Sequence, residues 1–267
     1  FAGWPQEPLD LNIEPSEMAE SDGIQLRSID FTSQNAVRLR VYVAQRTDLE
    51  QPDLVVLNVL DQPAWQDFLA TLRPGFEDVL QGEVDHLPVA NEVGYRNLQS
   101  MLHSFAWTMA YVSPRGIGPT AWDQSDFKQT QHRRRFYLLG QTLDGMRVWD
   151  VRRTVQALRS DEQLRSVPLW LQSSGSMAGV SAYAALFEPE IARLDLYDLP
   201  QTHRQGPYFL NVQRFLDMPQ AIAMAAERSR VVLYEADETA WAFPRAVTEL
   251  LGCETNLQFR TTATENK

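Results

Sequence analysis

Hydrophobic and polar residues alternate in the first part of this chain with the period of a β-strand. The alternation covers residues 24–33 and 37–45, and it predicts two antiparallel strands joined by a turn at residues 33–35. Residues 53–60 instead form an almost continuous apolar run. Such a run is typical of a strand that is buried on both faces. The pattern therefore predicts an antiparallel pair that leads into a buried part of a sheet.

Further along the chain, helical spacing alternates with short apolar runs of strand type. The pattern predicts helices over residues 65–80, 95–107, 133–160, 178–187, 218–227 and 243–252. It predicts strands over residues 108–112, 168–173, 191–199, 230–236 and 256–261. Repeated strand–helix units imply an α/β fold: a mostly parallel central sheet with helices on both faces and an antiparallel N-terminal edge. In such sheets, ligand sites form beyond the carboxyl ends of the strands.

The first part of the chain lacks these patterns. Residues 1–22 are rich in Pro, Glu and Asp, and they predict an extended arm or linker that packs on the surface of the following domain. Residues 23–267 carry the strand and helix patterns without an internal break, so we expect one α/β domain there. The chain begins with Phe1 and shows no signal-peptide pattern. This favours a processed chain or the C-terminal half of a longer protein.

Charge and apolar content exclude several classes of function. The formal net charge of −11 makes binding to nucleic acid or to an anionic membrane surface unfavourable. No apolar run approaches the ~20 residues that a membrane-spanning helix needs. We therefore expect a soluble protein and leave its compartment open, including export to the periplasm or outside a bacterial cell.

No cofactor or metal site is expected. The four histidines are not at metal-ligand spacing, and the single cysteine, Cys253, has no partner for a disulfide or a metal. Residues 115–122, RGIGPTAW, contain two glycines but lack the Gly-x-Gly-x-x-Gly pattern of dinucleotide binding.

The stretch VPLWLQSSGSMAG, residues 167–179, changes abruptly from a strand pattern to small residues. Ser176 has small residues two positions before it and two positions after it, Ser174 and Ala178. This spacing suits a nucleophilic serine on a tight turn from strand to helix. The alternative that stays open is an ordinary turn in which Ser176 caps the helix.

A nucleophile at this position also needs donors for a developing oxyanion. The helix that follows Ser176 would direct its N-terminal dipole at the negative charge. We expect the Met177 N–H to be one donor, and the loop that contains Asp61 to supply the other.

Residues 140–150, GQTLDGMRVWD, closely match the helix motif G-Q-S-L-x-G-M-R-x-W-D, with Thr142 in place of the motif serine. With SGSMAG, residues 217–237 and the order of the strands, they give a resemblance that covers most of residues 23–260. The sequence resembles the α/β-hydrolase superfamily, and more narrowly bacterial acetyl-xylan-esterase-like and prolyl-oligopeptidase-like hydrolases. The resemblance implies a catalytic triad in the chain order Ser, acid, His.

This resemblance implies that Asp237 is the acid, with Glu235, Glu238 or Asp198 as substitutes. The superfamily carries its histidine in the loop after the last strand, where this sequence has none. A serine without a base is a poor nucleophile. His203 is the best internal replacement as base because it follows the strand predicted at residues 191–199.

Two functions from different classes remain open. The first is a serine carboxylesterase that acts on small acyl esters, such as acetylated polysaccharide, with Arg115 and Trp122 lining its substrate site. The second is a non-catalytic hydrolase-fold domain that supports or pairs with a catalytic domain or chain. In both cases the expected ligand is a small-molecule or carbohydrate ester.

Overall fold

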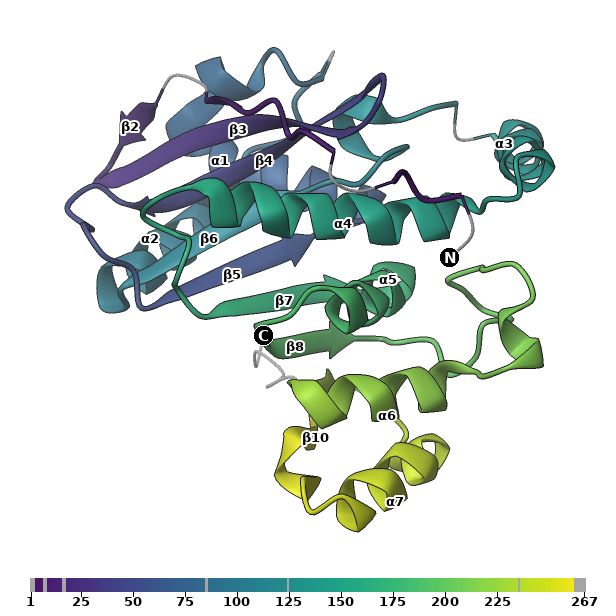
Figure 1. Cartoon of the computed structure of the whole chain (residues 1–267). Coiled ribbons are helices and arrows are strands. Elements are labelled where there is room, and N and C mark those ends of the chain that lie inside the picture. Colours follow the sequence, from purple (N-terminus) through teal and green to yellow (C-terminus); the bar gives the residue numbers. More distant parts are fainter. Residues whose placement is uncertain are drawn as a thin grey trace. The chain divides into compact units, whose positions relative to one another are not determined.

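The computed structural model describes residues 3–6, 9–15, 18–84, 86–123, 125–234 and 236–261 (Figure 1). The chain divides into two compact units whose segments interleave along the sequence. The first unit consists of Phe1–Trp4, Gln129–Arg152 and Leu169–Lys267. The second unit consists of Pro5–Lys128 and Arg153–Pro168. The domain boundary expected at residue 23 stays a prediction.

The second unit contains the antiparallel part of the fold. Its strands are β1 (Glu14–Pro15), β2 (Ala19–Ser21), β3 (Ile24–Gln34), β4 (Val37–Arg46), β5 (Leu54–Val59) and β6 (Trp107–Val112). They lie in the order β1-β3-β4-β6-β5, and β2 also pairs with β3. Only β5 and β6 are parallel. The predicted β3–β4 pair is confirmed, and so is the buried strand, because all six residues of β5 are buried.

Helices α1 (Gln62–Leu80) and α2 (Glu92–Ser104) pack against each other in the second unit, which also holds the 3₁₀ helix η1 (Gly118–Thr120). Rings of α1 pack in tilted contacts against rings of the sheet. The Phe68 ring centroid lies 5.0 Å from that of Tyr42 in β4 and 4.9 Å from that of Tyr111 in β6. These contacts bury the apolar stripe of α1, which the sequence spacing predicts.

The first unit is the parallel part. Strands β7 (Leu169–Ser174), β8 (Ile191–Tyr197), β9 (Arg230–Tyr234) and β10 (Leu257–Arg260) lie side by side in chain order, all parallel. Its helices are α3 (Asp126–Leu138), α4 (Leu143–Ser160), α5 (Gly175–Phe187), α6 (Met218–Arg228) and α7 (Ala242–Leu250), and α4 continues into the second unit. Short 3₁₀ helices are η2 (Val212–Arg214), η3 (Glu238–Trp241) and η4 (Glu254–Asn256). Figure 1 shows α5 lying along β7 and β8.

The single helix predicted over residues 133–160 is wrong. The chain forms two helices there, α3 and α4, separated at Gly140, whose φ is +69°. Glycine in the left-handed conformation is a common helix end. The next helix then starts with a cap, because the Thr142 hydroxyl accepts a hydrogen bond from the Gly145 N–H at 2.9 Å. The motif around Gly140 is therefore a helix end followed by a helix start.

The described residues of the predicted arm make contacts within each of the two units. Within the second unit, β1 and β2 extend the sheet by pairing with β3. Within the first unit, the Trp4 indole donates a hydrogen bond to the Gly145 carbonyl at 2.8 Å, and its ring lies 4.9 Å from that of Phe187. Among the described residues, no helix has the length and apolar character needed to cross a membrane.

Candidate functional site

The turn from β7 to α5 contains no loop residues. β7 ends at Ser174 in an extended conformation, and α5 begins at Gly175. Gly175 has a φ of +56°, in the left-handed region. This region costs an L-amino acid roughly 1–2 kcal/mol. A Cβ atom added to Gly175 would meet no described atom within 4 Å, so the backbone conformation, and not crowding, favours glycine there.

In a nucleophile elbow, the strained residue of the turn is the nucleophile itself. In this chain the strained residue is Gly175, and Ser176 follows it as the second residue of α5. The small residues Ser174 and Ala178 point to Ser176 as the turn residue, but the backbone places Ser176 one residue beyond the turn. Glycine takes the turn because it lacks a Cβ and enters the left-handed region at the least cost.

The Ser176 side chain is half-buried beneath the segment Gly206–Pro207. A Cβ atom on Gly206 would lie 2.9 Å from Ser176 Oγ, and one on Gly179 would clash with the Pro207 ring. The segment therefore crosses the first turns of α5 in close contact. Ser176 Oγ has no hydrogen-bond partner among the residues that the structure describes.

Ser176 lines a cavity of about 110 Å³, which we call the serine cavity. Its other lining residues are Gln129, Arg133, Tyr137, Thr142, Leu143, Asp144, Arg147 and Tyr208. No histidine occurs among these described lining residues. The Ser174 side chain does not cap α5, so the first N–H groups of the helix, including that of Met177, lack a side-chain acceptor. Ser176, Arg133 and Arg147 thus bring hydrogen-bond donors to the cavity and Asp144 brings a carboxylate, but no described lining residue is a histidine.

His203 lies in the segment after β8, contacts α5 through Tyr183 and is 3% exposed. Its Nδ1 is 2.7 Å from the Pro207 carbonyl oxygen, and its Nε2 is 2.8 Å from the Tyr183 hydroxyl. A carbonyl only accepts, so Nδ1 donates, and Nε2 of the neutral ring accepts from Tyr183. Burial lowers the pKa of His203, although the Pro207 carbonyl and Asp217 partly offset this effect. Both ring nitrogens are therefore engaged, and neither faces Ser176 as a base.

Asp217 holds the segment that carries His203. Its carboxylate accepts hydrogen bonds from the His203 backbone N–H at 2.6 Å and from the Thr202 hydroxyl at 2.7 Å. It also forms a capping box with Gln220 at the start of α6. Burial raises the pKa of Asp217, but these hydrogen bonds together bring it below its usual value. The Asp144 carboxylate fixes the same segment further on, where it accepts from the Tyr208 N–H at 2.8 Å.

The predicted acid, Asp237, is exposed just after β9. Its carboxylate accepts hydrogen bonds from the Thr239 N–H and hydroxyl at 3.0 and 2.8 Å, which lower its pKa. Of its substitutes, Glu238 pairs with an arginine of α7, Asp198 is exposed, and Glu235 lies outside the described residues. The structure does not bring any of these described carboxylates to His203.

The remaining predicted residues belong to the second unit. Asp61 caps α1 by accepting a first-turn N–H at 2.9 Å. The Arg115 side chain is buried and donates to Gln34 Oε1 at 2.8 Å. The Trp122 ring packs over a glycine of its own loop. Each residue thus has a structural role within its unit, and their roles at a substrate site stay predictions.

No protein-family model matches this sequence, and a search of curated proteins finds no similar chain. Solved structures do match its fold. One from Bacteroides fragilis, provisionally assigned as an acetyl xylan esterase, has a TM-score of 0.68 at 14% identity and covers 99% of this chain and 72% of its own. A glucuronoyl esterase from Solibacter usitatus has a TM-score of 0.62 at 12% identity and covers 96% and 82%. An acetyl xylan esterase from Paenibacillus sp. R4 has a TM-score of 0.53 at 10% identity and covers 95% and 83%.

The chain has an α/β-hydrolase fold. The resemblance and the fold class predicted from the sequence are thereby confirmed, with parallel strands in the first unit and antiparallel strands near the N-terminus. At such low identity the likeness carries the fold alone. What the site does must therefore be argued from the residues of this chain.

The sequence analysis did not identify three residues of this candidate site: Gly175, Asp144 and Asp217. Asp217 carries a readable signal, because an Asp followed three residues later by Gln, with Pro in the first turn, is a capping-box pattern. The roles of Gly175 and Asp144 depend on backbone conformation and on a distant segment, which spacing does not reveal. No group of three or more His, Cys, Asp or Glu side chains that could hold a metal ion occurs in the part of the chain that the structure describes.

Proposed function

We propose that this chain is an esterase-like domain that binds a small-molecule or carbohydrate ester without hydrolysing it through a serine. The observation that supports this proposal most strongly is the glycine at the strained turn between β7 and α5. Because Gly175 occupies the position that a nucleophile takes in an elbow, Ser176 lies in the first turn of α5 instead. The serine cavity supports the same conclusion, since none of its described lining residues is a histidine. In this role the domain would support or pair with a catalytic hydrolase domain or chain.

The serine cavity suits the acyl end of such an ester. An apolar cavity of about 150 Å³ is enough to hold benzene, so a cavity of about 110 Å³ favours a group of acetyl size. The Ser176 hydroxyl, the Arg133 guanidinium and the uncapped N–H groups of α5 would donate hydrogen bonds to its carbonyl oxygen.

Without a general base, the site would still bind an ester but would not hydrolyse it efficiently. A positioned general base contributes typically ~10²–10⁴-fold to a rate. A hydroxyl without a base keeps only what binding and the oxyanion donors supply. An ester seated in the serine cavity would therefore remain intact on the timescale of normal turnover.

A second candidate is a serine carboxylesterase acting on acetylated polysaccharide, with Ser176, Asp237 and His203 as its triad. One observation favours it: the Ser176 hydroxyl is unengaged among the described residues and lines a cavity. This candidate requires the His203 ring to give up its hydrogen bonds to Tyr183 and Pro207 and to form new ones to Ser176 and a carboxylate. It also requires the backbone N–H of Met177 and one of the loop that contains Asp61 as oxyanion donors, and it assigns Arg115 and Trp122 to the substrate.

Hydrolysis of p-nitrophenyl acetate and of acetylated xylan by the full chain separates the two candidates. We expect the unmodified chain and the Ser176→Ala variant to give the same background rate. Binding of an acetylated xylo-oligosaccharide, followed by NMR shifts, should weaken several-fold in Arg133→Gln and stay unchanged in Arg165→Gln, an exposed residue outside the cavity. Turnover that disappears in both Ser176→Ala and His203→Ala would establish the esterase instead.

A further inference from the structure

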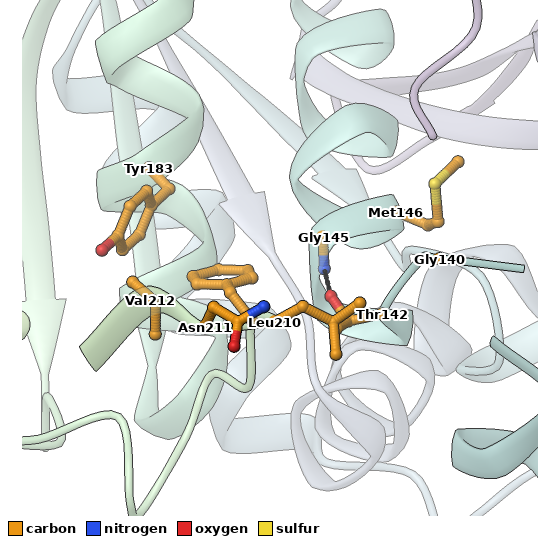
Figure 2. Close-up of a pocket in the computed structure, with 9 residues that line it drawn as sticks. Gly140, Thr142, Gly145, Met146, Tyr183, Leu210, Asn211 and Val212 are labelled. Carbon is orange, nitrogen blue, oxygen red and sulfur yellow. Dashed lines mark hydrogen bonds between the residues drawn. The ribbon is translucent and has the colours of Figure 1, made fainter. Parts of the chain in front are cut away.

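A second and larger cavity lies in the first unit, between the start of α4, the middle of α5 and the segment before η2 (Figure 2). We call it the apolar cavity. Its volume is about 360 Å³. Its lining residues are Gly140, Thr142, Gly145, Met146, Tyr183, Phe209, Leu210, Asn211 and Val212. Figure 2 shows Tyr183 on one side and Thr142 on the other.

The lining is mostly apolar and partly aromatic. The rings of Tyr183 and Phe209 meet edge to face, with centroids 4.7 Å apart. Leu210 and Val212 add aliphatic side chains to the lining. The exposed side-chain amide of Asn211 has no hydrogen-bond partner among the described residues, so it is available to a ligand at the cavity mouth. This combination favours a flat apolar group that carries one polar substituent.

The walls of the apolar cavity are held in place by hydrogen bonds outside it. The Tyr183 hydroxyl is tied to His203 Nε2 at 2.8 Å. On the opposite wall, Gly145 bonds to Thr142 Oγ1 through its N–H and to the Trp4 indole through its carbonyl, at 2.9 and 2.8 Å. A cavity whose walls are fixed before binding loses little ordering entropy when a ligand enters.

We propose that the apolar cavity binds a single aromatic ring with a polar substituent, as in a phenolic or hydroxycinnamoyl group. Benzene needs about 150 Å³, so about 360 Å³ accommodates a ring with a short side chain. The ring lies against Tyr183 and Phe209, and the polar substituent bonds to the Asn211 amide. This proposal goes beyond the proposed function, because it depends neither on the serine cavity nor on hydrolysis.

Calorimetric titration of the full chain with 4-hydroxycinnamate tests this site. Val212→Trp fills the cavity with an indole and should weaken binding at least tenfold. Leu250→Trp adds the same side chain at an exposed leucine of α7, outside the cavity, and should leave the affinity within twofold. Hexanoate should bind the unmodified chain at least fivefold more weakly than 4-hydroxycinnamate.

Asn211→Gly provides a second variant that does not depend on filling the cavity. Asn211 has a φ of +59°, which glycine adopts without strain, so the backbone is preserved. This variant should bind 4-hydroxycinnamate and unsubstituted cinnamate equally, whereas the unmodified chain prefers the former.

Three results would overturn the proposal. They are no binding of 4-hydroxycinnamate at millimolar concentration, equal binding by hexanoate, and full affinity in a folded Val212→Trp variant. None of these results bears on the p-nitrophenyl acetate assay, so this proposal and the proposed function fail independently.

Discussion

Two helices of the first unit begin in opposite ways, and the contrast separates stability from function. α6 is capped by Asp217, whose side chain forms a complete capping box and also accepts a hydrogen bond from the His203 N–H. α5 begins at Gly175 with a left-handed backbone and no side-chain cap. A capped start satisfies its own N–H groups, whereas an uncapped start leaves them for a ligand.

The two helix starts also differ in whether they lie beside a cavity. The uncapped start of α5 borders the serine cavity, while no described residue of the Asp217 capping box lines either cavity. Backbone strain and unsatisfied donors are concentrated at functional sites when the surrounding structure stabilises them. Here the surrounding stabilisation comes from the Gly206–Pro207 segment, which the Asp217 and Asp144 carboxylates hold on both sides.

The largest expected effect is on the capped helix. Asp217→Ala removes the α6 cap and two hydrogen bonds to the His203 segment, so it should lower the free energy of unfolding by about 2–3 kcal/mol. Asp237→Ala, which removes a cap of an exposed 3₁₀ turn, is the matched control and should cost less. Chemical denaturation measures both free energies of unfolding. Equal losses would show that the Asp217 contacts stabilise the fold no more than the Asp237 cap does.

A smaller effect is expected at the uncapped helix. Gly175→Ala should cost about 1–2 kcal/mol, because alanine is strained in the left-handed region although its Cβ has room. Gly82→Ala is the control, since a Cβ there also meets no described atom and the residue has no positive φ. Thermal unfolding of the two variants checks the difference. A Gly175→Ala variant as stable as Gly82→Ala would place the turn in another conformation.

The smallest effect concerns pH. Burial lowers the pKa of His203, so between its ordinary value near 6.5 and its folded value the unfolded chain binds more protons than the folded one. The free energy of unfolding therefore falls as the pH drops below about 6.5, because protonation of His203 is more favourable in the unfolded chain than in the folded one. His203→Gln should show a weaker loss between pH 7.5 and 5.5. The negative charges of Asp217 and Asp144 favour the charged ring and offset part of this lowering of the His203 pKa.

Melting temperatures of both proteins at the two pH values provide the measurement. An equal pH dependence in the variant would show that other groups cause the loss. A steeper loss in the variant would contradict the assignment of a neutral, doubly hydrogen-bonded imidazole.

Much of the fold follows from local pattern. The alternation in residues 24–33 and 37–45 predicts the antiparallel pair, and the apolar run at residues 53–60 predicts a buried strand, because a strand's period of two and its burial leave direct traces in composition. The break at Gly140 was missed because residues on both sides keep helical spacing. A single left-handed glycine ends a helix without disturbing the apolar pattern.

The sequence by itself determined the order of the strands from residue 24 onward, the hydrolase-like class and the position of a serine at the start of α5, but it merged α3 and α4 into one helix. Only the tertiary structure decided that Gly175, and not Ser176, takes the strained turn, because a backbone dihedral depends on the strand and helix that it joins. Only the tertiary structure decided that His203 faces Tyr183 and Pro207. The hydrogen-bond partners of His203 are set by packing between segments that are distant in the sequence. The spacing of residues along the chain does not reveal this packing.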